Sequence, residues 1–115
     1  MDIVLDFGKV QLEADLFDTK PGAALFDRLP QEIRLTSWGN EAYGPVSGET
    51  IASEAPVPEI PAGGLAYSRS GNYFCIFFGQ RPAWPVDYIG RIQGDTWQVL
   101  RTFTPESVVV RKNES

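Results

Sequence analysis

The sequence predicts a mainly β fold: a small, closed or nearly closed antiparallel β-barrel with one or two short helices. Residues 63–79 hold two apolar runs around the turn residues 69–72, which is the pattern of a β-hairpin. The second run, 73–78, has no polar break, as expected for a central strand that is buried on both faces. Six or more strand-like segments joined by hairpin turns then favour a barrel.

Residues 2–7 and 10–16 predict the first hairpin, with Gly8 and Lys9 as its turn. A glycine in the first position of a two-residue loop suits a type II′ turn. Residues that are paired directly across two strands point to the same face of the sheet. All the pairs that this turn would make are apolar: Phe7 with Val10, Leu5 with Leu12, and Ile3 with Ala14. This face should therefore join the core.

A short helix is expected over residues 20–29. Asp18 and Thr19 offer a capping side chain just before a proline in the first turn. Leu25 and Leu29 are spaced to share one apolar face. The proline after Leu29 disfavours the α conformation at that residue, so the helix should end there.

Residues 31–37 alternate between apolar and polar side chains and predict a third strand, with Ile33 and Leu35 pointing inward. Residues 38–45 hold two aromatic side chains and two glycines and are expected to form a turn region. Residues 46–62, with three prolines, have the composition of a long surface connection. Such connections are uncommon in compact domains, so a short edge strand or a functional lid is expected within it.

The C-terminal third gives weaker signals. Residues 80–87 predict a proline-containing loop and residues 88–93 a strand. Residues 96–102 leave two alternatives open, either the returning strand of a hairpin or a helix capped by Asp95. Residues 108–110 predict the last strand.

Composition excludes several classes of function. The chain has 115 residues, of which 43% are hydrophobic, so residues 1–115 are expected to form one domain with a real core. It has no histidine, which excludes Ser-His, Cys-His and His-metal chemistry. Its single cysteine, Cys75, lies inside an apolar run and is expected to be a small buried hydrophobe rather than a nucleophile. The carboxylates are scattered, so neither a metal site nor a cofactor is expected.

Charge and hydropathy bear on the partners. A net charge of −5 without a basic cluster opposes nucleic-acid binding. No apolar run approaches transmembrane length, and the N-terminal residues lack the basic start of a secretion signal. We therefore expect a cytoplasmic protein that binds neither nucleic acid nor membranes. The oligomeric state is left open, with a homodimer as one option.

Aromatic residues near a carboxylate mark the candidate binding site. Trp38, Glu41 and Tyr43 lie close together in an expected loop, where they could form aromatic walls and a carboxylate that orients a ligand. The alternative is a plug that closes the barrel, with Glu41 accepting hydrogen bonds from backbone amides. Trp84 lies between two prolines and suits either recognition or packing over the barrel mouth. Tyr67 could face the same cluster, although core packing is favoured.

The element order resembles that of cyclophilin, and more closely the small bacterial and archaeal cyclophilin-like family. The motifs that are similar to the family pattern are Trp38-Gly39-Asn40-Glu41-Ala42-Tyr43-Gly44, Gly64-Leu65-Ala66-Tyr67 and Cys75-Ile76-Phe77-Phe78-Gly79. The resemblance covers nearly the whole chain and implies a cyclophilin-like barrel. It also favours a helix over residues 95–102.

The resemblance implies a fold and leaves enzyme activity open. Cyclophilin isomerases use an arginine on an early strand, then a motif with phenylalanine, methionine and glutamine that ends in Gln-Gly-Gly, and a histidine in a later loop. Arg34 stands near the arginine position, but the residues after it, 35–38, do not match the motif. Trp84 lies in a loop similar to the one that carries a pocket tryptophan, where the family's histidine is missing here.

Two hypotheses follow from the resemblance and the candidate residues. The favoured one is a non-catalytic binding module that takes a small molecule or an extended peptide on the barrel face. The alternative is a weak prolyl isomerase that uses Arg34. A cleft built from Trp38, Glu41, Tyr43 and Trp84, with Arg34 elsewhere, would favour binding.

Overall fold

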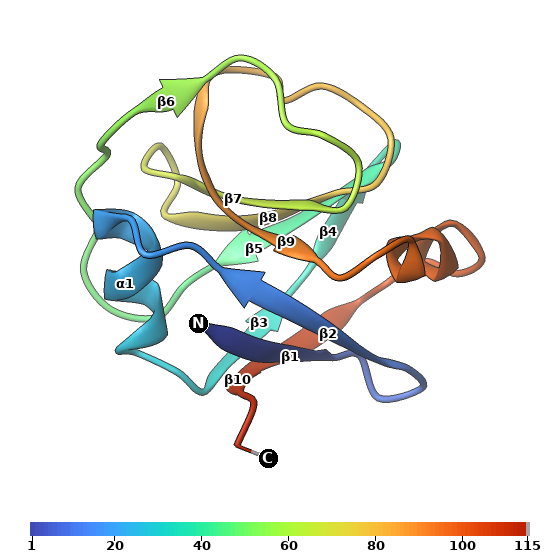
Figure 1. The fold of residues 1–115 in the computed structure, drawn as a ribbon. Coiled ribbons are helices and arrows are strands. Elements are labelled where there is room, and N and C mark those ends of the chain that lie inside the picture. The colour runs from blue at the N-terminus through green and yellow to red at the C-terminus, as the bar shows by residue number, and fades with distance from the viewer. Residues whose placement is uncertain (115) are drawn as a thin grey trace.

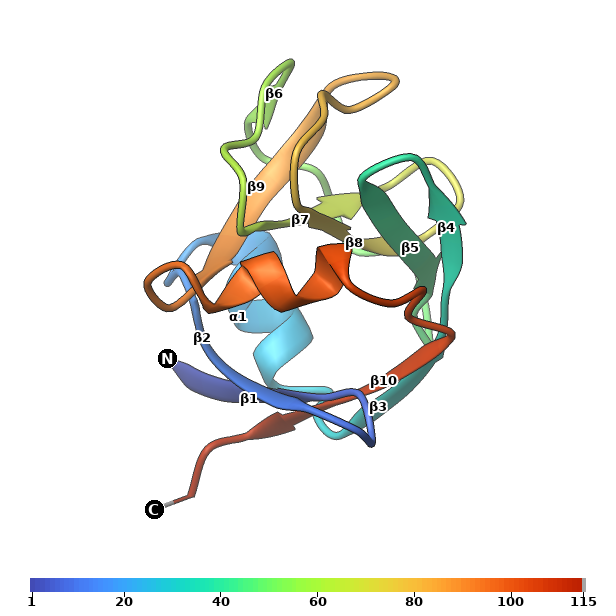
Figure 2. The same ribbon diagram turned by 90° about the vertical axis from the view of Figure 1, so that its right-hand side faces the viewer.

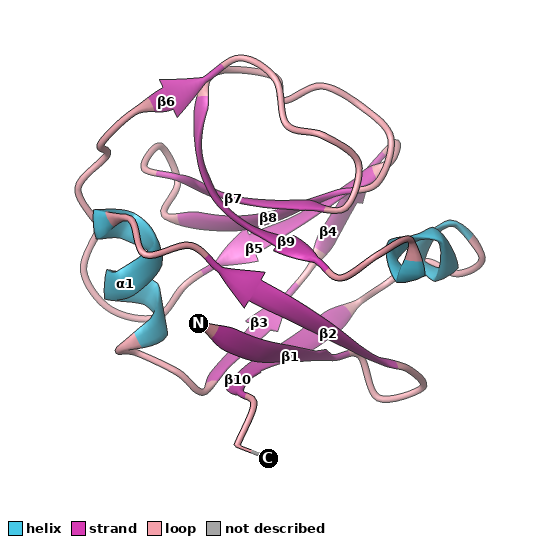
Figure 3. Ribbon diagram, viewed as in Figure 1, coloured by secondary structure: helices cyan, strands magenta, loops and turns pink. Residues whose placement is uncertain are grey.

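The computed structural model describes residues 1–114, which form one ten-stranded antiparallel sheet curled into a nearly closed barrel with two short helices (Figure 1). The elements are β1 (Asp2–Asp6), β2 (Gln11–Leu16), α1 (Lys20–Phe26), β3 (Gln31–Arg34), β4 (Thr36–Trp38), β5 (Glu41–Pro45), β6 (Pro56–Val57), β7 (Gly64–Ser68), β8 (Tyr73–Phe77), β9 (Val86–Ile92), the 3-10 helix η1 (Thr96–Arg101) and β10 (Ser107–Lys112). Strands dominate the chain, and the two helices lie at opposite ends of the barrel (Figures 2 and 3). The predicted fold class is confirmed.

The barrel closes because the two ends of its strand order are joined in the chain. The order is β3-β10-β1-β2-β9-β7-β8-β5-β4, with β6 paired to β9 outside this path. Only Leu35 separates β3 from β4, and its backbone N–H donates a hydrogen bond to the carbonyl of Glu106 at 2.8 Å. Gly44 on β5 lets the strands meet there, since a Cβ at this position would lie 2.0 Å from the carbonyl oxygen of Arg34.

The first hairpin has the register that the sequence predicts. Ile3 lies opposite Ala14 and Leu5 opposite Leu12, and the backbone N–H of Phe7 donates to the carbonyl of Val10. The turn glycine, Gly8, has φ +87°, which favours glycine over other residues. The paired apolar side chains enter the barrel core. The hairpin prediction is therefore confirmed.

The central hairpin, β7 and β8, is buried on both faces as predicted. On the inner face of β8, Phe74 and Ile76 join the barrel core. On the outer face, Cys75 and Phe77 belong to a second apolar cluster that includes Val86 of β9. The barrel wall thus carries apolar side chains toward two separate cores, which is why the run 73–78 shows no alternation.

The helix α1 is shorter than the predicted 20–29. Thr19 caps it through a hydrogen bond from the backbone N–H of Gly22, as the sequence indicates. After Phe26 the backbone tightens, because the N–H of Arg28 donates to Leu25 and that of Leu29 donates to Phe26. These bonds span three residues instead of four, so the α-helix ends before the proline that was expected to stop it.

The structure also settles the predictions for three further segments. Residues 38–45, expected as a turn region, contribute to a strand pair, because β4 and β5 form a hairpin around Gly39 and Asn40. Residues 96–101 form the helix η1 rather than a returning strand. The expected short edge strand within residues 46–62 is present as β6.

No helix within residues 1–114 has the length and apolar character needed to span a bilayer.

Asp87 on β9 anchors the long connection that carries β6. Its carboxylate accepts hydrogen bonds from the Ser53 hydroxyl at 2.7 Å and from the backbone N–H groups of Glu54 and Ala55 at 2.9 and 2.8 Å. The side chain is buried, and bonds to a charged acceptor are stronger than those between neutral groups. This carboxylate therefore holds residues 53–55 against the barrel.

We expect Asp87→Ala to lower the free energy of unfolding by about 2 kcal/mol, because two backbone N–H groups lose their acceptor. Chemical denaturation measures this change. Amide exchange at Glu54 and Ala55 should accelerate more than exchange in β7. Ser53→Ala, which removes only one of the three bonds, is the milder control. Unchanged exchange at both amides in Asp87→Ala would contradict the anchoring role.

Candidate functional site

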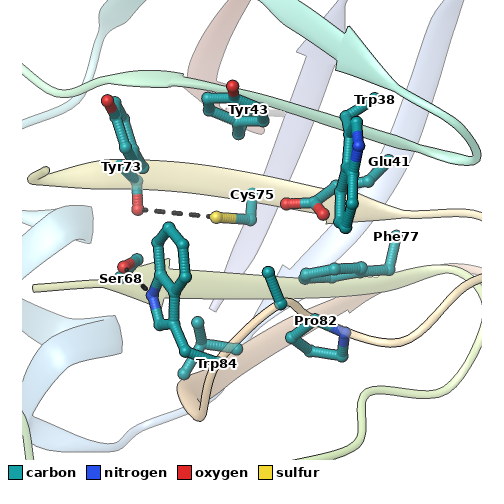
Figure 4. Close-up of a pocket in the computed structure, with 11 residues that line it drawn as sticks. Trp38, Glu41, Tyr43, Ser68, Tyr73, Cys75, Phe77, Pro82 and Trp84 are labelled. Atoms are coloured by element: carbon teal, nitrogen blue, oxygen red, sulfur yellow. Dashed lines mark hydrogen bonds between the residues drawn. The ribbon is translucent and has the colours of Figure 1, made fainter. Parts of the chain in front are cut away.

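A pocket of about 320 Å³ lies on the outer face of the barrel (Figure 4). It is bounded by β4, β5 and β8 and by the loop of residues 79–85. The residues that line it are Trp38, Glu41, Tyr43, Ser68, Tyr73, Cys75, Phe77, Pro82, Ala83, Trp84 and Val86. Its volume falls within the range of small-molecule sites.

Strand register brings the carboxylate and the aromatic rings to one face. Trp38 lies directly opposite Glu41 in the β4–β5 pair, so both side chains point to the same face. Tyr43 follows two residues after Glu41 and shares that face. Across the β5–β8 pair, Glu41 lies opposite Phe77 and Tyr43 opposite Cys75. One face of three neighbouring strands therefore forms the pocket floor.

The loop of residues 79–85 forms the opposite wall and is fixed near both ends. The side-chain oxygen of Gln80 accepts a hydrogen bond from the backbone N–H of Asn40 in the β4–β5 turn. The indole Nε1–H of Trp84 donates to the Ser68 hydroxyl at 2.9 Å. Gly39 allows the first contact, since its φ is +60° and a Cβ there would lie 2.2 Å from the Gln80 oxygen. The wall is therefore held in place without a ligand.

The pocket rim carries exposed aromatic surface. Within residues 1–114, the large hydrophobic side chains that are exposed are Trp38 at 53% and Trp84 at 48%, and both line the pocket. Tyr43 and Tyr73 pack edge to face, with ring centroids 5.0 Å apart. Exposed apolar surface gathered around a hollow is typical of a binding site.

Glu41 places a carboxylate in this aromatic setting. The residue is only 7% exposed, and burial raises the pKa of its carboxyl to about 7, although a hydrogen bond with the Cys75 thiol acts in the opposite direction. Figure 4 shows the carboxylate turned toward the Cys75 side of the pocket. Within the described residues 1–114, the pocket lining includes no lysine or arginine. Near neutral pH the carboxyl group is therefore divided between its neutral and charged forms.

Cys75 has the environment of a structural thiol. Its sulfur lies 3.9 Å from the carbonyl oxygen of Tyr73, and the side chain is buried. Burial raises the pKa of the thiol, and the charge of Glu41 raises it further. The thiol therefore stays protonated at neutral pH, which disfavours nucleophilic chemistry. Among residues 1–114, no three Cys, Asp or Glu side chains gather closely enough to ligate a metal ion.

The structure brings together four of the six candidate residues: Trp38, Glu41, Tyr43 and Trp84. Tyr67 instead lies in the barrel core, where its hydroxyl donates to Asn72 and accepts from the backbone N–H of Ile51. Its inward position follows from strand alternation, because its neighbour Ser68 takes the outward position.

Arg34, the sixth candidate, does not line the pocket. It lies on β3, exposed, and is paired with Ser107 of β10. The plug alternative for Glu41 also finds no support, since within residues 1–114 no backbone amide donates a hydrogen bond to its carboxylate, which faces the pocket.

Sequence reasoning missed the other lining residues. They are Ser68, Tyr73, Cys75, Phe77, Pro82, Ala83 and Val86. A usable signal lay within residues 73–78, whose odd-numbered members share one face of a strand and whose even-numbered members share the other. Which face opens to solvent depends on how loops 46–62 and 79–85 cover the barrel, and local patterns do not show that.

Comparisons with known proteins agree with this fold. The family model described as Cyclophilin-like matches residues 1–111. The solution structure of a hypothetical protein from Archaeoglobus fulgidus superposes with a TM-score of 0.75 at 26% identity, covering 98% of this chain and 95% of that one. The structure of McbB in complex with tryptophan has a TM-score of 0.72 at 18% identity.

The McbB likeness covers 98% of this chain but 45% of McbB, and at that identity it shows the fold alone. The search of curated proteins found no significant match. The family model, in contrast, matches nearly the whole sequence, and the nearly closed barrel with its two short helices is consistent with a cyclophilin-like fold. The chain belongs to the cyclophilin-like family.

Proposed function

We propose that this protein is a non-catalytic binding module that takes a small molecule or an extended peptide segment in the outer pocket. The observation that carries the proposal is the placement of the two exposed tryptophans, Trp38 and Trp84, on either side of a hollow of about 320 Å³. Exposed tryptophan is uncommon on surfaces without a partner, and it is among the residues that contribute most to binding.

The fixed walls support binding. Trp84 is tied to Ser68, and the loop before it is tied to the β4–β5 turn through Gln80. A ligand would therefore meet side chains that are already ordered, which lowers the entropic cost of association. The chemistry of the pocket favours binding over bond making, since its lining holds one carboxyl group and a protonated thiol and, among the residues that the structure describes, no basic side chain.

The test is an NMR titration of the labelled protein with a small-molecule fragment library and with extended proline-containing peptides. The chemical-shift changes that a true ligand causes in the protein should be concentrated on β4, β5, β8 and residues 79–85. Trp38→Ala and Trp84→Ala should each lower the affinity for that ligand by about tenfold or more, which is the effect expected from removing a residue that contributes strongly to binding. Arg34→Ala, a substitution outside the pocket, is the control. Shifts gathered on another face would overturn the proposal.

The isomerase alternative depends on Arg34, whose position does not favour it. Arg34 precedes Trp38 by four strand positions, or up to about 13 Å along an extended chain. Prolyl isomerisation needs a donor placed beside a pocket that grips the proline, and a misplacement of about 1 Å can reduce the rate a hundredfold. The observed pocket and the candidate donor are separate.

We expect exchange of a standard Xaa-Pro peptide to stay near the uncatalysed rate, with a time of about 10–100 s. Arg34→Ala should leave the measured rate unchanged, because Arg34 does not line the pocket. A protease-coupled or NMR exchange assay measures it. Strong acceleration by the natural sequence that disappears in Arg34→Ala would replace the binding-module proposal with the isomerase.

A further inference from the structure

We infer that the group received by this pocket is an alkylated ammonium ion, enclosed by the aromatic rings and paired with the Glu41 carboxylate. The inference rests on the proposed binding function and names the chemical class of the ligand. Three properties of the pocket lead to it: the kind of rings in its walls, the lack of a positive partner for its carboxylate, and the mainly apolar character of its lining.

The walls present four rings of the types that attract cations most strongly. Trp38 and Trp84 stand at the rim, and Tyr43 and Tyr73 are packed against each other between β5 and β8. The faces of tryptophan and tyrosine rings carry negative potential, and cages of such rings bind quaternary ammonium groups. A purely apolar ligand would need no such choice of rings, since leucine or phenylalanine would bury equal area.

The carboxylate has no partner of opposite charge in the described chain. Glu41 is 7% exposed, and a buried charge is ordinarily paired. In the part of the chain that the structure describes, no lysine or arginine lines the pocket, and the loop residue Arg81 is exposed and paired with Glu59 at 2.7 Å. A bound cation would supply the missing charge. The net charge of −5 also favours the approach of cations over anions.

The lining is mainly apolar, and its side-chain acceptors besides this carboxylate are the neutral hydroxyls of Ser68, Tyr43 and Tyr73, which affects which cations it suits. A primary ammonium group brings three N–H donors that lose water on burial and need acceptors. The Ser68 hydroxyl is already engaged by the Trp84 indole. An alkylated ammonium ion has fewer N–H groups, or none, and its methyl groups match the apolar walls. The pocket therefore suits an alkylated ion better than a primary amine.

Proton linkage gives the inference a second signature. The titratable groups around the site are Glu41 and Tyr43 on β5 and Tyr73 and Cys75 on β8, while β4 and the wall loop add none to the lining. Since burial raises the pKa of Glu41 to about 7, a cation must displace a proton to pair with it at lower pH. Affinity should therefore fall about tenfold between roughly pH 8 and pH 6.

The probes are choline and its neutral carbon analogue, in which a tert-butyl group replaces the trimethylammonium group. Both have nearly the same shape, so the difference between them isolates the charge. A peptide that carries trimethyl-lysine distinguishes a side-chain source from a free ion. Affinities are measured by NMR titration at about pH 8 and pH 6, where Glu41 is mostly ionised and mostly neutral respectively.

Choline should bind the natural protein at least about tenfold more tightly than the neutral analogue at the higher pH. Glu41→Gln keeps the size of the side chain and should abolish this preference and its pH dependence. Tighter binding of the trimethyl-lysine peptide than of choline would assign the ion to a peptide side chain, and the reverse order would assign it to a free molecule. Either order supports the ammonium class.

Equal binding of choline and the neutral analogue, unaffected by Glu41→Gln, would overturn the inference while leaving a binding pocket in place. A preference for choline that survives Glu41→Gln would overturn the role of the carboxylate. If no probe moves the pocket resonances, the ammonium class is wrong, and the fragment and peptide titration decides separately whether the pocket binds anything else.

Discussion

Phe74→Ala is expected to lower the free energy of unfolding by about 3–5 kcal/mol, as large-to-small changes in a packed core do. Phe74 is fully buried on the inner face of β8 and lies opposite Tyr67 on β7 and Gly44 on β5. The cavity would open inside the wall of the barrel, where hydrogen-bonded strands on both sides prevent collapse. Equilibrium unfolding in urea measures the loss.

Trp38→Ala is the contrasting control, because it removes a larger side chain from an exposed position. It should change the free energy of unfolding by less than about 1 kcal/mol. An unfolding midpoint of Phe74→Ala equal to that of the natural protein would refute the assignment of β8 as the central strand. The comparison also separates stability from binding, since Trp38→Ala is expected to impair the pocket alone.

Elements with short-range signals could be predicted from the sequence. The first hairpin could be predicted because Gly8 determines the turn type and the turn type determines the strand register. The three apolar pairs follow from that register alone. The central strand could be predicted because no polar residue interrupts the apolar run 73–78. In both cases a few neighbouring residues carry the whole signal, and the structure keeps the predicted pairing and burial.

The prediction was wrong where an element depends on contacts between residues far apart in the chain. Residues 38–45 look like a loop because two glycines interrupt the apolar pattern, yet each glycine serves a tertiary contact. Gly39 makes the tight turn against Gln80, and Gly44 lets β5 approach β3 where the barrel closes. Locally these glycines disfavour strands. The long-range packing that overrides this preference cannot be read from the segment itself.

The candidate site was partly predictable for the same reason. Trp38, Glu41 and Tyr43 are close in sequence, so their grouping could be proposed without knowing the sheet order. The contribution of Cys75 and Phe77 depends on the β5–β8 register, which joins segments that are far apart in the chain. Tyr67 was ambiguous because β7 is buried on both faces, and apolar character gave no indication of which face it takes.

Glu41→Gln is expected to stabilise the protein at alkaline pH by up to about 3 kcal/mol, even though it should abolish cation binding. Burial raises the pKa of the carboxyl from its ordinary value of 4.5 to about 7 in the folded protein. Each pKa unit corresponds to about 1.4 kcal/mol of difference between the two protonation states. Glutamine mimics the neutral acid and avoids the cost of ionising it in the pocket.

The sign of the pH dependence follows from the direction of this shift. Between pH 4.5 and about 7 the folded protein holds a proton on Glu41 that the unfolded chain has released, so stability falls as pH rises through this window and stays lower above it. Burial and the neighbouring Asp2 also raise the pKa of Asp15, so the natural protein should carry further pH dependence of the same sign.

The informative quantity is therefore the difference in unfolding free energy between Glu41→Gln and the natural sequence, measured by urea denaturation across the pH range. It should be near zero below the window and reach its full value above it. A difference that stays constant with pH would show that Glu41 ionises as readily in the pocket as in water, and would remove the desolvated carboxylate on which cation selection depends.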